Sequence, residues 1–447
     1  MRSPEESADP LLRRLEDRES SARTYSRRLP VALASARGCL VRDTSGREYI
    51  DCLAGAGSLA LGHHHPVVVA ALQDALAAEV PLTTLDMATP LRDAFTETLL
   101  ESLPPGLRDG RIQFCGPTGA DAVEAALKLV RTATGRAGVI AFGGAYHGMT
   151  QGTMAVSGAH APKLPLGALG GDVQHMPFPS SYRCPFGAPG EESARLCGRA
   201  VDWALSDDHS GVVPPAGLIV EPVQGEGGVN PAPRAFARAV RDATRRAGVP
   251  LIADEVQTGL GRTGALWASE AIDLDPDVIV LSKAIGGGLP LAVIVYRREL
   301  DRWAPGAHAG TFRGNQLAMA AGAATIRHVV DAGLDEHAAV MAARLEEHLR
   351  AHADGVAAVG DVRGRGLMLG VEMVDPGAPD ADGVPRPDGE LAAAVQRAML
   401  DLGVIVESGG RDGAVLRFLP PLVIGADEVD RVGAAFGEAL RQTGAAR

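Results

Sequence analysis

The sequence carries no excess of positive charge. Its 447 residues have a formal net charge of −12. A chain with this charge repels polyanions, which excludes nucleic acid as a partner. The short arginine groups are diluted by acids, and the one in residues 238–246 falls at helical spacing and predicts a solvent-exposed helix face.

Cysteine is also scarce, and no two cysteines form a CxxC pair. The odd number, five, predicts reduced and mostly buried thiols rather than disulfides or a metal site. The polar N-terminal residues lack the apolar core of a signal peptide and predict a mobile lead-in. We therefore expect a cytoplasmic protein.

Long apolar runs are absent as well. The most apolar stretch, from Val278 to Tyr296, is interrupted by Lys283 and Pro290. It predicts two buried strands around a loop and excludes a membrane span.

The chain has the pattern of an α/β protein. From about residue 111 to 296, short apolar runs alternate with amphipathic segments. This alternation predicts a mainly parallel central sheet with helices on both faces. After about residue 333 the pattern changes to that of a smaller α+β domain, in which residues 375–389, rich in Pro, Gly and Asp, predict an exposed loop.

Two charged residues follow successive apolar runs. Asp254 ends the run 250–254, and Lys283 follows the run 277–281. Ligands of parallel sheets bind at the carboxyl ends of strands. A pyridoxal phosphate enzyme needs a lysine that holds the aldehyde as a Schiff base and a carboxylate that keeps the pyridine nitrogen protonated. Taken singly, the lysine could lie on the surface and the aspartate could cap a helix.

Glycine-rich turns around these residues favour the same cofactor. Thr118, Gly119 and Ala120 precede a strongly helical segment, where free N–H groups suit a phosphate, although Thr118 could simply cap the helix. Tyr146 lies among glycines and could stack on a flat ligand or pack in the core. Thr311 lies in a glycine-flanked turn and could be a second phosphate contact or an ordinary turn residue.

An arginine inside an apolar strand needs an acidic partner. Arg417 lies in such a strand, and Glu226 or a substrate carboxylate could pair with it. The adjacent histidines of residues 63–65 predict no metal site, because neighbouring side chains on an irregular segment point in different directions.

Eight segments occur in the order in which they occur in class III aminotransferases, which the chain resembles over residues 25–445. They are DCLAGAGSLALGHHHP, GPTGADAVEAALK, AYHG, EPVQGEGG, ADEVQTGLGRTG, SKAIGGGLP, TFRGNQ and VLRF. The resemblance implies fold type I, pyridoxal 5'-phosphate and a homodimer with shared active sites. It also implies a mobile lead-in over 1–24, an N-terminal segment of the small domain over 25–85, a large cofactor domain over 86–333 and a C-terminal small domain over 334–447.

The resemblance also implies roles for individual residues. Lys283 would bind the cofactor and shuttle a proton, Asp254 would pair with the pyridine nitrogen, and Tyr146 would stack on the ring. Gln257 would approach the phenolic oxygen. Gly119 and Ala120 would hold the phosphate, which Thr311 of the other subunit would reach. Glu226 would release Arg417 when the α-carboxylate of glutamate enters.

Two departures from the family pattern narrow the substrate. Met149 stands where 4-aminobutyrate enzymes carry an arginine, and Arg313 follows Phe312 in a turn where many members have glycine. Glu226 favours a transaminase over a mutase. The segments look closest to the diaminobutyrate–2-oxoglutarate branch, which implies transfer of the 4-amino group of L-2,4-diaminobutyrate to 2-oxoglutarate. An ornithine, lysine or other ω-amine transaminase and a non-catalytic scaffold remain alternatives.

Overall fold

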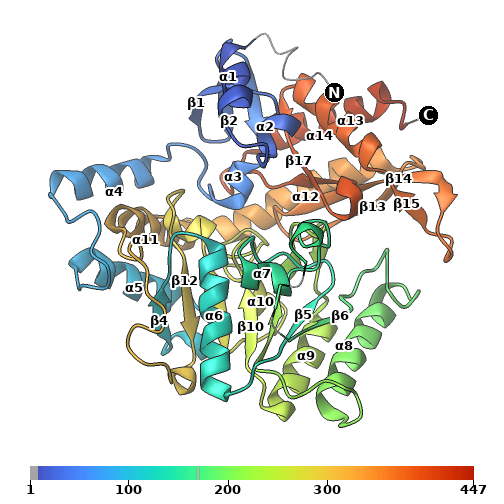
Figure 1. Ribbon diagram of the computed structural model, residues 1–447. Helices are drawn as coiled ribbons and strands as arrows, with labels where there is room; N and C mark the ends of the chain where they lie inside the picture. Colours follow the sequence, from blue (N-terminus) through green and yellow to red (C-terminus); the bar gives the residue numbers. More distant parts are fainter. Residues whose placement is uncertain (1–8, 168, 171, 447) are drawn as a thin grey trace.

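The computed structural model describes residues 9–167, 169–170 and 172–446. Within them, a seven-stranded sheet forms the centre of the larger part of the molecule (Figure 1). Its strands, in spatial order, are β4 (Arg111–Phe114), β12 (Val293–Tyr296), β11 (Val278–Leu281), β10 (Leu251–Asp254), β7 (Gly217–Val220), β5 (Val139–Phe142) and β6 (Val173–Met176).

The sheet is mainly parallel, as the sequence predicts. Neighbouring strands from β11 to β6 are parallel, and β12 is antiparallel to both of its neighbours. Every residue of β5, β7, β10, β11 and β12 is buried. Apolar strands of this kind are stable only when both faces of the sheet are covered.

Helices cover the two faces. Val139 and Ala141 pack in one cluster with α6 (Gly119–Thr134), whereas Ile140 and Phe142 pack in another with α8 (Gly190–Ser206) and α9 (Arg234–Ala247). The alternation follows from the two-residue period of a strand. The predicted α/β class is therefore confirmed.

The smaller part brings together both ends of the chain. One sheet contains β1 (Leu33–Arg37), β2 (Leu40–Asp43), β3 (Glu48–Asp51) and β16 (Val404–Ile405), and its β3 is parallel to β16. The other contains β13 (Val359–Gly364), β14 (Leu369–Pro379), β18 (Val415–Phe418), β17 (Glu407–Gly409) and β15 (Pro385–Pro387). Its helices are α12 (Leu334–Ala353), α13 (Gly389–Asp401) and α14 (Ala426–Gln442). The domain boundaries given above stay predictions.

The structure differs from the sequence prediction in residues 375–389. Instead of an unpaired loop, β14 continues to Pro379 and pairs with β15 as a hairpin. The turn residues Asp380 and Gly383 close it: Asp380 accepts hydrogen bonds from the Asp382 and Val384 N–H groups. Polar composition predicted the exposure of this segment but concealed its pairing.

The N-terminal segment lies against the smaller part. Residues 1–8 of the predicted mobile lead-in lie outside the described residues, and the described remainder contains α1 (Pro10–Arg18). The next helix, α2 (Tyr25–Arg28), is tied to β17, because the Arg28 guanidinium donates to the Ser408 carbonyl at 2.9 Å. The remaining longer helices are α4 (Pro66–Ala77), α5 (Pro90–Ser102) and α11 (Gln316–Asp331).

The structure can be compared with the sequence predictions on membrane spans and on cysteines. None of the described helices is long and apolar enough to cross a bilayer, and the apolar stretch from Val278 folds as the two predicted strands β11 and β12. All five cysteines are free, and four of them are buried, as predicted.

Candidate active site

The predicted residues meet at one edge of the central sheet. Strands β4, β5, β7, β10 and β11 all end there, and the turns that follow them surround a pocket of about 460 Å³. Pockets of this size hold small ligands. The lining includes eight of the predicted residues: Thr118, Gly119, Ala120, Tyr146, Glu226, Asp254, Gln257 and Lys283.

Lys283 presents its side-chain amine to this pocket. It begins the 3-10 turn η4 (Lys283–Gly286) with a left-handed backbone, φ 50°. Among the residues that the structure describes, none forms a hydrogen bond or ion pair with its Nζ. Burial lowers the pKa of Lys283 below its ordinary value, although the charge of Glu226 opposes this. A lysine with a lowered pKa supplies more neutral amine, which is the nucleophilic form.

Asp254 is held by a buried histidine. Its Oδ2 lies 2.7 Å from His147 Nδ1, and its Oδ1 accepts the Val256 N–H at 3.0 Å. Burial alone would lower the pKa of His147, but the hydrogen bond and charge of Asp254 outweigh burial and raise it. The histidine therefore fixes the position of the Asp254 carboxylate at the pocket.

The turn before α6 presents free backbone N–H groups at the pocket. Gly119 and Ala120 open the helix, so their N–H groups have no intrahelical acceptor. A Cβ at position 119 would lie 3.0 Å from Val256 Cγ1, so glycine lets the helix start pack closely against Val256. Thr118 caps the helix, because its Oγ1 accepts the Asp121 N–H at 3.2 Å.

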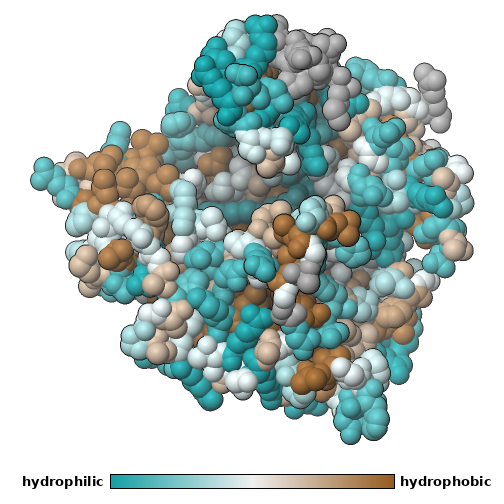
Figure 2. Space-filling view, in the orientation of Figure 1, coloured by the Kyte–Doolittle hydropathy of each residue, from teal (hydrophilic) through white to brown (hydrophobic). Residues whose placement is uncertain are grey.

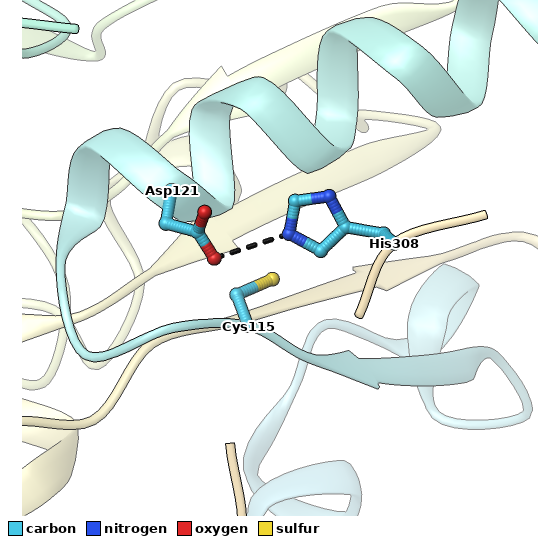
Figure 3. A group of neighbouring side chains, drawn as sticks. All are labelled: Cys115, Asp121 and His308. Carbon is cyan, nitrogen blue, oxygen red and sulfur yellow. Dashed lines mark hydrogen bonds and ion pairs between the residues drawn. The ribbon is translucent and has the colours of Figure 1, made fainter. Parts of the chain in front are cut away.

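Hydrogen bonds to Asp121 hold this turn in place (Figure 3). His308 Nε2 lies 3.1 Å from Asp121 Oδ2, which also accepts the Gly116 N–H. Cys115 lies beside them, and the three possible ligand atoms are within 4.8 Å of one another. Burial raises the pKa of the Cys115 thiol far above its ordinary value, so the free thiol stays protonated. The group joins the loop around residue 308 to the turn before α6.

Glu221 supports the wall of the pocket that carries Tyr146. Its two carboxylate oxygens accept the Tyr146 N–H at 2.9 Å and the Gly225 N–H at 3.1 Å. Burial raises the pKa of Glu221 to about 7. Tyr146 itself is 39% exposed and faces the pocket, which leaves one side of its ring open to a ligand.

The raised pKa of Glu221 has a measurable consequence for stability. Between its ordinary value of 4.5 and about 7, the folded protein keeps a proton that the unfolded chain has lost, so stability falls as the pH rises through this window. Between pH ~5 and pH ~8, the free energy of unfolding of the Glu221→Gln variant should fall by about 2–3 kcal/mol less than that of the parent protein.

Urea unfolding at the two pH values measures this difference. Glu191→Gln, at an exposed position on α8, is the control and should follow the parent protein. Equal pH dependence of the parent and Glu221→Gln proteins would show that Glu221 does not titrate in this window.

Arg417 is fully buried behind the pocket and holds three side chains. Its Nη1 donates to Glu226 at 2.7 Å and to Glu407 at 3.0 Å, and its Nη2 donates to Gln257 at 2.9 Å. Burial opposes ionisation of Glu226, but the charges of Arg417 and Lys283 outweigh it and lower the pKa of Glu226. The predicted pairing of Glu226 with Arg417 is present. Gln257 also donates to the Ala56 carbonyl at 3.1 Å.

Sequence reasoning missed two members of this group. Glu407, on β17, is buried against Arg417, and the Tyr25 hydroxyl hydrogen-bonds to it. Ten residues separate Glu407 from Arg417, and α2 is almost 400 residues away from both. The apolar run 404–406, which Glu407 follows directly, was the only sequence signal for Glu407.

The other predicted residues lie outside the pocket lining. Thr311 is exposed in this chain, and Arg313 pairs with Asp86 at 2.6 Å. The three histidines contact different groups: His63 pairs with Asp51 at 2.9 Å, His64 is exposed, and the His65 ring lies 4.8 Å from that of His328.

The pocket lies at the carboxyl ends of the strands and contains an unpaired lysine, an aspartate bound by a histidine, and a helix start with free N–H groups. This is the arrangement of a pyridoxal-phosphate-type enzyme. The model of the family "Aminotransferase class-III" matches residues 21–440. The chain belongs to the class III aminotransferases.

Two relatives of this chain within the family carry the same enzyme name. The chain is 54% identical to the diaminobutyrate–2-oxoglutarate aminotransferase of Rhizobium meliloti strain 1021, over 97% of this chain and 93% of the relative. It is 48% identical to the enzyme of the same name from Haemophilus influenzae, over 92% of this chain and 90% of the relative.

Solved structures agree with the fold. An amine transaminase from an uncultivated Pseudomonas species, in its PLP-bound form, superposes with a TM-score of 0.85 at 27% identity and covers 95% of this chain and 98% of its own. The ornithine aminotransferase of Toxoplasma gondii superposes with a TM-score of 0.82 at 28% identity, covering 98% of this chain and 95% of its own.

Proposed function

We propose that this aminotransferase moves the 4-amino group of L-2,4-diaminobutyrate to 2-oxoglutarate and gives L-aspartate 4-semialdehyde and L-glutamate, reversibly. The observation that carries the proposal is the 54% identity to a relative of that name over nearly the whole chain. The unpaired Lys283 amine, beside the Glu226 and Arg417 pair, supports the chemistry.

The pocket fits pyridoxal 5'-phosphate. Gly119 and Ala120 would hold the phosphate, Tyr146 would lie against the ring, and Asp254 would face the ring nitrogen, with Gln257 near the phenolic oxygen. The helix start at Gly119 and Ala120, whose N–H groups lie at the pocket, and the unpaired Lys283 amine are the observations that support this fit. When bound, the cofactor supplies an aldehyde that condenses with amines and a ring that accepts electrons.

Lys283 then serves as an acid and a base. Its lowered pKa favours the neutral amine, so Nζ can take a proton from the substrate carbon and return it elsewhere. The rigid η4 turn keeps Nζ directed into the pocket, so the lysine is already placed when substrate enters.

Asp254 would stabilise a positive charge on a nitrogen that faces it. The hydrogen bond from His147 fixes the carboxylate and supports its charge, so that Asp254 stabilises a proton on a facing nitrogen. His147 acts through Asp254 and is a positioning residue.

The Glu226 and Arg417 pair would let one pocket take two substrates. While Glu226 covers the guanidinium, the pocket accepts the terminal amine of the donor. When glutamate or 2-oxoglutarate enters, its α-carboxylate replaces Glu226 on Arg417. Met149, 55% exposed, brings no cation to bind the carboxylate of 4-aminobutyrate.

We also propose a homodimer in the cytoplasm. The surface over α4 is apolar (Figure 2), and large side chains there and nearby are exposed, among them Leu76, Leu82, Met87 and Phe312. Exposed apolar side chains that lie together on a surface favour association. Phe312 adjoins Thr311, which supports a phosphate contact from Thr311 to the other subunit. Five free thiols favour a reducing compartment.

A coupled glutamate-formation assay tests the substrate. Diaminobutyrate, ornithine, lysine and 4-aminobutyrate are compared as donors, with 2-oxoglutarate or pyruvate as acceptor. We expect kcat/KM for diaminobutyrate to exceed that for ornithine, one methylene longer, by about 10-fold or more. Equal kcat/KM values across the donors would contradict the proposal and favour a broad ω-amine transaminase.

A further inference from the structure

A long connection joins η5 (Arg298–Leu300) to α11. Residues 301–314 form no helix or strand. Irregular loops of about this length are uncommon in compact domains unless they have a function. Thr311 and Phe312 are exposed, Phe312 by 62%, and neither belongs to the pocket lining of its own chain. These two side chains are therefore presented to a surface outside the chain's own site.

The connection is fixed to α6 and to the strand before it. His308 Nε2 lies 3.1 Å from Asp121 Oδ2 (Figure 3), and the Gln113 side-chain amide donates to the His308 carbonyl at 3.2 Å. Lys128 Nζ donates to the Ala307 carbonyl at 2.9 Å. The backbone just before Thr311 is thus held by three separate contacts.

Arg313 fixes the other side of Thr311. Its Nη1 donates to the His308 carbonyl, five residues earlier, at 2.9 Å, so the guanidinium spans the turn 308–313. Its Nη2 pairs with Asp86 at 2.6 Å. The Arg313 side chain is 15% exposed but that of Asp86 is 66% exposed, and water screens such a pair. The contact with the His308 carbonyl is therefore the main restraint.

The guanidinium of Arg313 is not free to bind a ligand, because both terminal nitrogens have partners within the chain. The backbone after it is also fixed: the Thr84 N–H donates to the Gly314 carbonyl at 3.2 Å, and the Gln316 N–H to the Leu82 carbonyl at 3.1 Å. Leu82 belongs to the apolar surface of the proposed dimer. A turn held at both ends loses little conformational entropy when its exposed side chains bind.

We propose that Arg313 is a positioning residue, which holds Thr311 in place to contact the phosphate of the cofactor bound in the partner subunit. The inference rests on the proposed homodimer and its shared phosphate contact. Arg313 closes the turn, and Thr311 supplies the hydroxyl donor. Loss of Arg313 therefore weakens cofactor binding in the pocket of the other subunit and not in the pocket of its own.

Dimers of two differently substituted subunits, purified through two affinity tags, test this distinction. One subunit carries Lys283→Ala, so only the pocket of the other subunit binds the cofactor through a lysine. In the first dimer, Arg313→Ala lies in the Lys283→Ala subunit. In the second dimer, it lies in the subunit that keeps Lys283. Titration with pyridoxal 5'-phosphate, followed by the absorbance of the lysine-bound cofactor, gives the dissociation constant of that one pocket.

The two dimers should differ. In the first, the pocket with Lys283 receives the altered turn, and its dissociation constant should rise about 10-fold over that of the dimer with Lys283→Ala alone. In the second, the pocket receives an unaltered turn, and the constant should stay within about 2-fold of that reference. If Arg313 only stabilised its own subunit, the second dimer would show the loss instead, or both would show it equally.

Further variants in the same two arrangements separate the contacts. Thr311→Val should reproduce the difference between the dimers, because it removes the hydroxyl itself. Arg313→Lys keeps the charge but not the two-pronged geometry and should cause an intermediate loss. Asp86→Asn removes only the screened ion pair and should cause a smaller loss than Arg313→Ala. Arg386→Ala, at an exposed position on β15, is the matched control and should leave both constants unchanged.

Equal constants in the two dimers, or a larger constant in the second, would overturn the proposal. Sedimentation before the titration shows whether each dimer has assembled. A parent protein that sedimented as a monomer would refute both the homodimer and this inference. Failure of the diaminobutyrate assay would refute the proposed substrate but would not alter the cofactor titration, so the two failures are distinguishable.

Discussion

The Lys283→Ala enzyme is expected to lose turnover with diaminobutyrate and 2-oxoglutarate by about 10⁴-fold or more, because one change removes both the nucleophile and the acid–base group. Gly119, Ala120 and Asp254 remain, so the variant should still bind the cofactor, without a covalent link. Steady-state kcat and the absorbance of the purified protein measure the two effects separately.

The chain offers close controls for this experiment. Its only other lysines are Lys128 and Lys163, and neither lines the pocket. Their alanine variants should keep parental kcat. Borohydride reduction of the loaded parent enzyme, followed by peptide mapping, should place the added mass on the peptide that contains Lys283. A label on either other lysine would refute the assignment.

The second large effect is expected from Asp254→Asn. Asparagine keeps the size and the Val256 contact, but it removes the charge that stabilises a proton on the facing nitrogen. We expect kcat to fall about 10³-fold, similar to the loss of one oriented electrostatic group in other active sites. His147→Asn should cause a smaller loss, because it removes the support of the carboxylate and not its charge.

Cofactor content distinguishes this effect from a folding defect. The Asp254→Asn protein should keep bound cofactor and a parental melting temperature, whereas Asp242→Asn, at an exposed position on α9, should match the parent in every measurement. A kcat within about 10-fold of the parent, with full cofactor, would mean that another group performs this role.

Much of this site was predictable because ligands of parallel sheets bind at the carboxyl ends of strands. Asp254 and Lys283 follow buried strands that are neighbours in a parallel sheet, so local patterns alone bring them to one edge. The glycines near Thr118 and Tyr146 could be placed for the same reason. The central sheet itself was predictable because most of its strands are short, mainly apolar and separated by amphipathic helices.

The parts that sequence reasoning missed depend on contacts between distant segments. Tyr25 and Glu407 meet only because α2 packs on β17, and no local pattern encodes that contact. His147 was visible among its glycines, but its bond to Asp254 was not. The hairpin at 375–389 was missed because Pro and Gly content indicates turns and does not exclude pairing at a sheet edge.

The backbone of Lys283 shows what the fold gives up at this position. Its φ of 50° lies in the left-handed region, where a side chain other than glycine costs about 1–2 kcal/mol. For stability alone, glycine would be the better residue, as it is at the following turn position Gly287, φ 61°. The lysine therefore marks a trade between conformational ease and reactivity, in which the chain tolerates local strain to keep an amine where the chemistry needs it.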